Sequence, residues 1–207
     1  MSPLETLGWT LGTSFASGLN LYATVAAAGL LQYFGVIQLP PALQVLALPI
    51  VWGIALALFV VEFVADKIPV VDSAWDTVHT FIRPPAAAIL AYSAFGDVPD
   101  AWKYGAALLA GSVALTSHGA KATTRVAANS SPEPFSNWIL STIEDLFAIG
   151  LAWLAAEHPV LTGVIVVVLV ILCVFLIWKL FGFFQRAVAR IRGAPLTSPS
   201  GASSGSG

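Results

Sequence analysis

The most constraining feature of the sequence is its long apolar runs, of which Val160 to Trp178 is the cleanest. A helix needs about 20 apolar residues to cross a bilayer, and in the hydrocarbon its backbone polar groups must be satisfied internally. Such runs recur along a chain that is 57 % hydrophobic and only 10 % charged. The sequence therefore predicts an all-α, polytopic membrane protein with a single transmembrane domain over residues 1–192.

The runs predict about six membrane segments separated by short loops. The segments are Gly8–Phe34, Gln44–Ala65, Val70–Gly96, Trp102–Ala128, Phe135–Ala156 and Val160–Trp178. Pro84 and Pro85 break or kink the third segment, which is either one kinked span or a re-entrant hairpin. Residues 17–20 could also separate two half-helices of the first segment, as in many transporters.

The basic residues predict the orientation. The pattern of Lys179 to Arg192 predicts a basic amphipathic helix suited to an anionic cytoplasmic leaflet. Residues 193–207 are rich in Ser, Gly and Pro, which predicts a disordered tail. With six crossings both termini are cytoplasmic, and among the lysines and arginines only Lys103 falls outside. We therefore expect a protein of the bacterial inner membrane.

The two halves of the chain, about residues 8–96 and 102–192, resemble each other. Gly12 aligns with Gly111, Thr24 with Thr123, and Asn20 with Gly119. Three spans in each half would insert the halves in opposite directions. We therefore expect a 3+3 inverted-topology repeat with broken or re-entrant helices, an architecture common among secondary transporters.

The stretch 59–84 gathers ionisable residues between apolar runs. Asp72, Asp76, His79 and Arg83 follow one another at intervals of four, three and four, which places them on one helical face. Such a face could lie at the membrane surface with its charges solvated. It could instead line a cavity, where carboxylates with a histidine could bind a divalent cation or relay protons, and the arginine could hold an anion.

Other segments carry polar residues that could meet this face. We expect the acidic stripe to lie opposite the basic stripe of residues 118–125, or opposite Glu144 and Asp145, on the cytoplasmic half. The candidate ion or substrate pathway comprises Ser17, Asn20, Glu62, Asp66, Lys67, Asp72, Asp76, His79, Arg83, His118, Lys121, Arg125, Glu144 and Asp145. No metal is assigned to these residues.

Three stretches resemble a known family: VEFVADKIPVVDSAWDTVHTFIRPPAAAIL, SGLNLYATVAAAGLL and SHGAKATTRVAANSSPEP. Together they are similar to an uncharacterised bacterial and plastid membrane family, domain of unknown function 4126. The residues that carry the resemblance are Glu62, Asp66, Lys67, Pro69, Asp72, Trp75, Asp76, Arg83 and Pro84. The resemblance covers the chain up to about residue 192 and implies an integral membrane protein with no established activity.

The leading hypothesis is a small transporter or channel for an ion or a small solute, anionic solutes included. Membrane lipids and a second copy of the chain are the expected partners, and the net charge of −2 argues against nucleic acid. Two alternatives are a structural or assembly protein without transport and an intramembrane lipid-modifying enzyme. No HExxH, GxSxG or phosphate-loop motif supports the enzyme, so we expect neither catalysis nor a cofactor.

Overall fold

The structure is a computed structural model that describes residues 1–129 and 134–191, and these residues form helices without any strand. The helices are α1 (Pro3–Leu19), α2 (Leu21–Tyr33), the short 3-10 helix η1 (Pro41–Ala47), α3 (Pro49–Ala65), α4 (Pro69–His79), α5 (Arg83–Ala94), α6 (Asp100–Asn129), α7 (Pro134–Glu157) and α8 (Pro159–Ile191). The predicted all-α class is confirmed. The tail predicted to be disordered, residues 193–207, lies outside the described residues.

Two of the described helical stretches, Asn137–Glu157 and Pro159–Phe183, are long and apolar enough to cross a membrane. Helices η1 and α3, bent by 65° at their junction, would together make a third. The predicted membrane character is therefore supported by two or three helices, and the predicted number of six spans is not shown. The bend lies inside the expected segment Gln44–Ala65, just before Pro49, which cannot continue a helical hydrogen-bond ladder.

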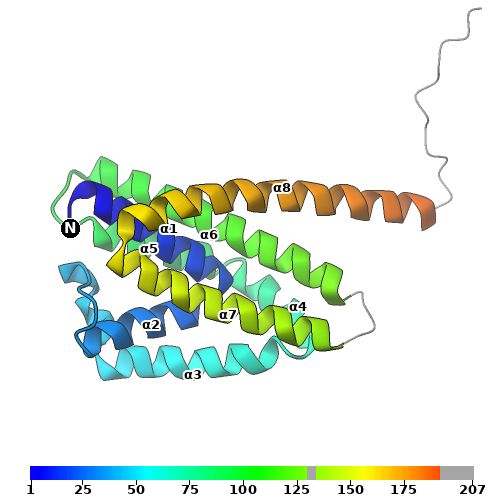
Figure 1. Ribbon diagram of the computed structural model, residues 1–207, viewed down its shortest axis with the longest axis horizontal. Helices are drawn as coiled ribbons and strands as arrows, with labels where there is room; N and C mark the ends of the chain where they lie inside the picture. The colour runs from blue at the N-terminus through cyan, green and yellow to red at the C-terminus, as the bar shows by residue number, and fades with distance from the viewer. Residues whose placement is uncertain (130–133, 192–207) are drawn as a thin grey trace, which may run out of the picture.

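The first expected segment, Gly8–Phe34, is a helical hairpin rather than one span. Asn20 has an extended backbone (φ −149°, ψ 103°) that ends α1, and its side-chain oxygen accepts a hydrogen bond of 2.8 Å from the Ala23 amide to start α2. The break expected within residues 17–20 is thus present. However, α2 returns toward the end of the bundle where α1 begins (Figure 1), so the expectation of a single crossing here is wrong.

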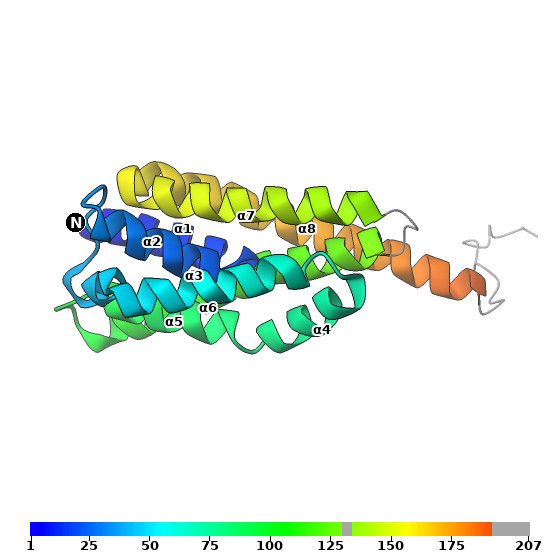
Figure 2. The ribbon, with the colours of Figure 1, turned by 90° about the horizontal axis from the view of Figure 1, so that it is seen from below.

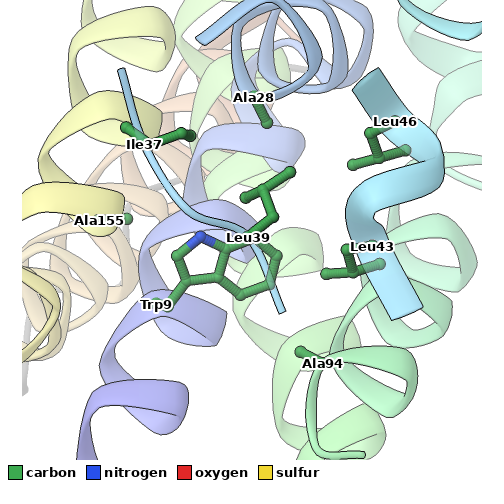
Figure 3. Close-up of a cluster of buried hydrophobic side chains, with 8 residues drawn as sticks. All are labelled: Trp9, Ala28, Ile37, Leu39, Leu43, Leu46, Ala94 and Ala155. Carbon is green, nitrogen blue, oxygen red and sulfur yellow. The ribbon is translucent and has the colours of Figure 1, made fainter. Parts of the chain in front are cut away.

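An apolar cluster shows that the two arms of the hairpin lie antiparallel. Trp9, near the start of α1, packs in one cluster with Ala28, near the end of α2 (Figure 3). Leu39, from the loop after α2, and Leu43, from η1, pack against the same indole. Trp9 is only 2 % exposed, so this cluster closes the N-terminal end of the bundle with tightly packed apolar side chains.

The third expected segment, Val70–Gly96, is divided into α4 and α5. The two helices follow each other in the same direction along the bundle, back toward the end where α3 begins (Figure 2). The structure therefore shows the kinked arrangement and not the hairpin. The break falls at residues 80–82, because Pro84 and Pro85 occupy the first turn of α5, where a proline is tolerated.

Helix α1 lies at the centre of the bundle and packs against α5, α6, α7 and α8. Small residues allow this close approach, as is usual between membrane helices. A Cβ atom added at Gly12 would lie 2.6 Å from the Ala155 and Thr162 side chains, and one at Gly18 would collide with Ser117. The glycines of α1 therefore place its backbone directly against α6, α7 and α8.

The chain begins at one end of the bundle, and α8 ends beyond the other (Figure 1). This placement disagrees with the expectation that both termini lie on one side, because the α1–α2 hairpin returns to the end it came from. The halves also differ locally. Gly119, which aligns with Asn20, lies inside the continuous helix α6, so the expected repeat is not seen in these helices.

Candidate functional site

The ionisable residues of the expected pathway gather around the tip of the α1–α2 hairpin, where α3, α4, α5, α6 and α7 meet it. Buried carboxylates come from the end of α3, from α4 and from α7, and buried cations come from α5 and α6. We call these side chains the charged cluster; its members are Glu62, Asp66, Lys67, Asp72, Asp76, Arg83, His118, Lys121, Arg125, Glu144 and Asp145. The acidic and basic stripes therefore meet inside the protein.

Arg83, the first residue of α5, is completely buried and joins three elements. Its Nη2 forms an ion pair with Glu62 of α3, and its Nη1 donates to the Gly18 carbonyl at 2.9 Å. The same nitrogen lies 2.8 Å from Nδ1 of His118 and 3.9 Å from Asp76. The guanidinium thus holds the last turn of α1 against α3 and α6.

The contacts of His118 define its tautomer. Because Arg83 can only donate, Nδ1 of His118 must accept, and the ring proton must lie on Nε2. Nε2 lies 3.1 Å from the Asp76 carbonyl, which can accept this proton. His118 is therefore a neutral link between Arg83 and the backbone of α4.

Lys121 connects α6 with the end of α3 and with the hairpin. Its Nζ donates to Asp66 Oδ2 at 2.9 Å and to the Leu19 carbonyl at 3.1 Å, and it lies 3.7 Å from Glu62. Each of these side chains is 0 % exposed. The carbonyl end of α1 carries the negative end of the helix dipole, so two cations, Lys121 and Arg83, complement it.

Arg125 makes the densest set of polar contacts. Its Nε and Nη2 donate to one oxygen of Glu144 at 3.1 and 2.6 Å, and its Nη1 donates to the Asn137 side chain at 2.8 Å. Carboxylates of Asp66 and Asp72 lie 3.3 and 3.6 Å away. The guanidinium thus joins α6 to α7 and to the segment between α3 and α4.

Asp145 is less well paired. It is 3 % exposed, and its Oδ1 accepts 2.8 Å from the side-chain amide of Asn20 at the hairpin tip. Lys67, half-buried, donates to Ser141 at 2.5 Å and lies 3.7 Å above the Phe63 ring. The structure therefore places Lys67 against α7, the helix that carries Asp145.

Two expected site residues lie at the edge of the charged cluster. His79 contacts the Trp75 carbonyl at 2.9 Å and the Tyr22 hydroxyl of α2 at 3.1 Å, and none of these partners is charged. Ser17 is completely buried in α1, and its hydroxyl has no hydrogen-bond partner among the described residues. These residues border the hairpin without entering the ion-pair network.

The sequence reasoning missed several groups that complete this site. The Gly18 and Leu19 carbonyls could not be assigned, because only the hairpin turns them toward cations. Asn137 and Ser141 had a readable signal. They precede Asp145 by eight and four residues and therefore share its face of α7.

Three described cavities lie outside the charged cluster, and apolar side chains line them. The largest, of about 600 Å³, lies between the starts of α1 and α6 beside Leu4 and Trp102. A second, of about 350 Å³, lies between α2, α3 and α5. Within the described chain, no group of three or more His, Cys, Asp or Glu side chains is arranged to hold a metal ion.

The described residues form an all-helical bundle in which two or three helices are long and apolar enough to cross a membrane, which is consistent with a membrane protein. The chain belongs to the family described as domain of unknown function (DUF4126), which matches residues 7–179. No curated protein and no solved structure matches the chain.

Proposed function

We propose that the protein is a small inner-membrane transporter whose ion path passes the charged cluster at the hairpin tip. The observation that carries the proposal is the burial of so many charges around one break between half-helices. Each charge inside a bilayer costs about 2.5 kcal/mol or more on insertion scales. Apolar residues would hold a bundle together as well or better, so burying charge here points to a use beyond folding.

The arrangement supports a topology of five crossings and one re-entrant hairpin. The crossings are α3, the kinked pair α4–α5, α6, α7 and α8, and the re-entrant element is α1–α2. The end of α3, which Lys67 follows in the chain, and the C-terminal part of α8, whose sequence includes Lys179 and Arg186, lie toward one end of the bundle (Figure 1). The start of α6 at Asp100 and the end of α7 at Glu157 lie at the other end. The positive-inside rule then places the start of α1 outside and the end of α8 in the cytoplasm.

The re-entrant hairpin supports a role in gating. Its outer part packs around Trp9 in an apolar cluster, which would exclude water and ions on the outer side. Its tip meets the charged cluster, and half-helix ends at such breaks coordinate ions in transporters. An ion would therefore pass between the hairpin and α6 or α7 when the hairpin moves.

A flux assay in proteoliposomes tests the proposal, with separate gradients of H⁺, Na⁺, K⁺ and Cl⁻. We expect wild-type protein to carry at least one ion and Asp76→Asn to abolish its flux while leaving the protein folded. Asp76 is suited to this test because it is 5 % exposed and its Oδ1 has no hydrogen-bond partner in residues 1–129 and 134–191. Asp100→Asn, at an exposed side chain, is the matched control and should retain wild-type flux.

The alternative function is a structural or assembly protein, which is favoured by the closed contacts of Arg125 with Glu144 and Asn137. In that case no ion is carried, and Asp76→Asn lowers the melting temperature. Lys121→Gln added to Asp76→Asn would then cost little more, because both residues serve one network. Wild-type flux combined with a stably folded Asp76→Asn variant would exclude this alternative.

A further inference from the structure

Asp145 differs from the other carboxylates of the charged cluster in having no cationic partner within 4.0 Å among the described residues. Asp66 lies 2.9 Å from Lys121, and Glu144 lies 2.6 Å from Arg125. Within the described part of the chain, Asp145 has one hydrogen bond, to Asn20 through Oδ1, while its Oδ2 is buried without a partner. An unpartnered carboxylate oxygen in a 3 % exposed side chain is costly unless something binds to it.

The charge balance of the cluster points the same way. Among the described residues it contains six carboxylates, and only four cations even when the half-buried Lys67 is included. Ionisation of every group would leave two negative charges without compensation inside the protein. Uptake of a positive charge by a carboxylate would lower this cost, and Asp145 is the carboxylate with an oxygen available and no paired cation.

The groups around Asp145 come from each neighbouring element. Asn20 faces it from the hairpin tip, Lys67 from the turn after α3, and Lys121 from α6, with Glu62 and Asp66 behind Lys121. Both lysines are already engaged, with Ser141 and with Asp66. Helix α8, which packs against α7, offers no Asp, Glu, Lys, Arg or His between Val160 and Trp178, and its one titratable side chain there is the Cys173 thiol.

We propose that Asp145 binds the transported ion and that this ion is a proton. A proton needs a single acceptor atom, which Oδ2 provides, whereas a metal cation needs several oxygen ligands. A proton from water on one side forms an O–H bond at Oδ2, and the same bond breaks to release it to water on the other side. This inference rests on the proposed function and identifies the ion that the site would take.

The hydrogen bond from Asn20 couples the protonation of Asp145 to the position of the hairpin tip. Its amide donates to an ionised carboxylate in the empty site and to a neutral acid once the proton has bound. A hydrogen bond to a charged acceptor is roughly twice as strong as one to a neutral acceptor. Proton binding therefore loosens one of the contacts that hold the tip, beside those of Gly18 and Leu19, and favours hairpin movement.

Two measurements on the full-length protein test the proposal. In proteoliposomes with an imposed pH gradient and an internal pH dye, we expect proton flux that is lost in Asp145→Asn. Asp145→Glu, which keeps an acidic oxygen, should retain part of it, and the surface control Asp100→Asn should retain all of it. In infrared difference spectra between neutral and acidic pH, the exposed carboxylates also give carbonyl stretches when they are protonated. The separate carbonyl-stretch component of a buried protonated acid should be lost in Asp145→Asn and remain in Asp100→Asn.

The outcomes separate this inference from the proposed function. Proton flux that survives in Asp145→Asn, or an infrared band that persists in it, overturns Asp145 as the site and leaves the transporter standing. Flux of Na⁺ or K⁺ without proton flux overturns the choice of ion alone. Wild-type vesicles that carry none of H⁺, Na⁺, K⁺ and Cl⁻ overturn the proposed function and this inference together.

Discussion

Arg83→Gln is the most informative single change for the charged cluster. Arg83 and Glu62 are both 0 % exposed, so removing the guanidinium leaves a buried carboxylate with one neighbouring cation among the described residues, Lys121, 3.7 Å away. Breaking a buried ion pair on one side costs about 3–5 kcal/mol. We expect the free energy of unfolding to fall by about 3 kcal/mol, toward the low end of this range because Lys121 still offsets part of the charge.

The double variant Glu62→Gln/Arg83→Gln separates the ion pair from other contacts of Arg83. It removes the stranded carboxylate, so its loss should be smaller than the sum of the two single losses by about 2 kcal/mol. The double variant still lacks the hydrogen bond from Arg83 to the Gly18 carbonyl, which is worth about 1 kcal/mol. Wild-type stability is therefore not fully restored.

Equilibrium unfolding in mixed micelles, titrated with a denaturing detergent, measures these differences. Lys103→Gln is the control, because Lys103 pairs at 3.5 Å with Asp100, whose side chain is 68 % exposed, and the loss of such a solvated pair costs less than about 1 kcal/mol. The reasoning is refuted if Arg83→Gln is as mild as Lys103→Gln, or if the effects of Glu62→Gln and Arg83→Gln simply add.

Two further changes test the hairpin itself. Gly18→Ala places a methyl group against Ser117 and should lower the free energy of unfolding by about 1–3 kcal/mol. Gly150→Ala, which has open space around it, is the control and should change this free energy by less than about 1 kcal/mol. Equal effects of the two substitutions in thermal unfolding would contradict the close packing of α1 against α6. Asn20→Ala removes the cap of α2 and the hydrogen bond to Asp145, and should cost about 1–3 kcal/mol. A stability equal to wild type would show that the hairpin tip is not held by Asn20.

The helices and the charged faces could be predicted from the sequence, because they depend on local periodicity. Intervals of three and four residues placed His118, Lys121 and Arg125 on one face of α6, and the structure buries all three. The proline pair at 84–85 likewise indicated the break between α4 and α5. These signals depend on neighbouring residues and need no knowledge of the tertiary structure.

The hairpin could not be predicted in the same way. Hydropathy is the same whether α2 continues across the bundle or turns back, and the direction is set by distant partners. Asp145 holds Asn20, while the loop after α2 returns Leu39 to the Trp9 indole. The expected even number of crossings, with both termini on one side, followed from treating the first segment as one span.

The side on which the chain begins tests the re-entrant hairpin most directly. Ser2→Cys in a Cys173→Ala background gives a single cysteine, and intact cells are treated with a membrane-impermeant maleimide. Gln38→Cys and Asp100→Cys in the same background are the controls for labelling from outside. Five crossings with a hairpin from the outside predict that Ser2 is labelled as readily as the two controls. Labelling of Ser2 only after the membrane is permeabilised would contradict the account and restore a first segment that crosses the bilayer.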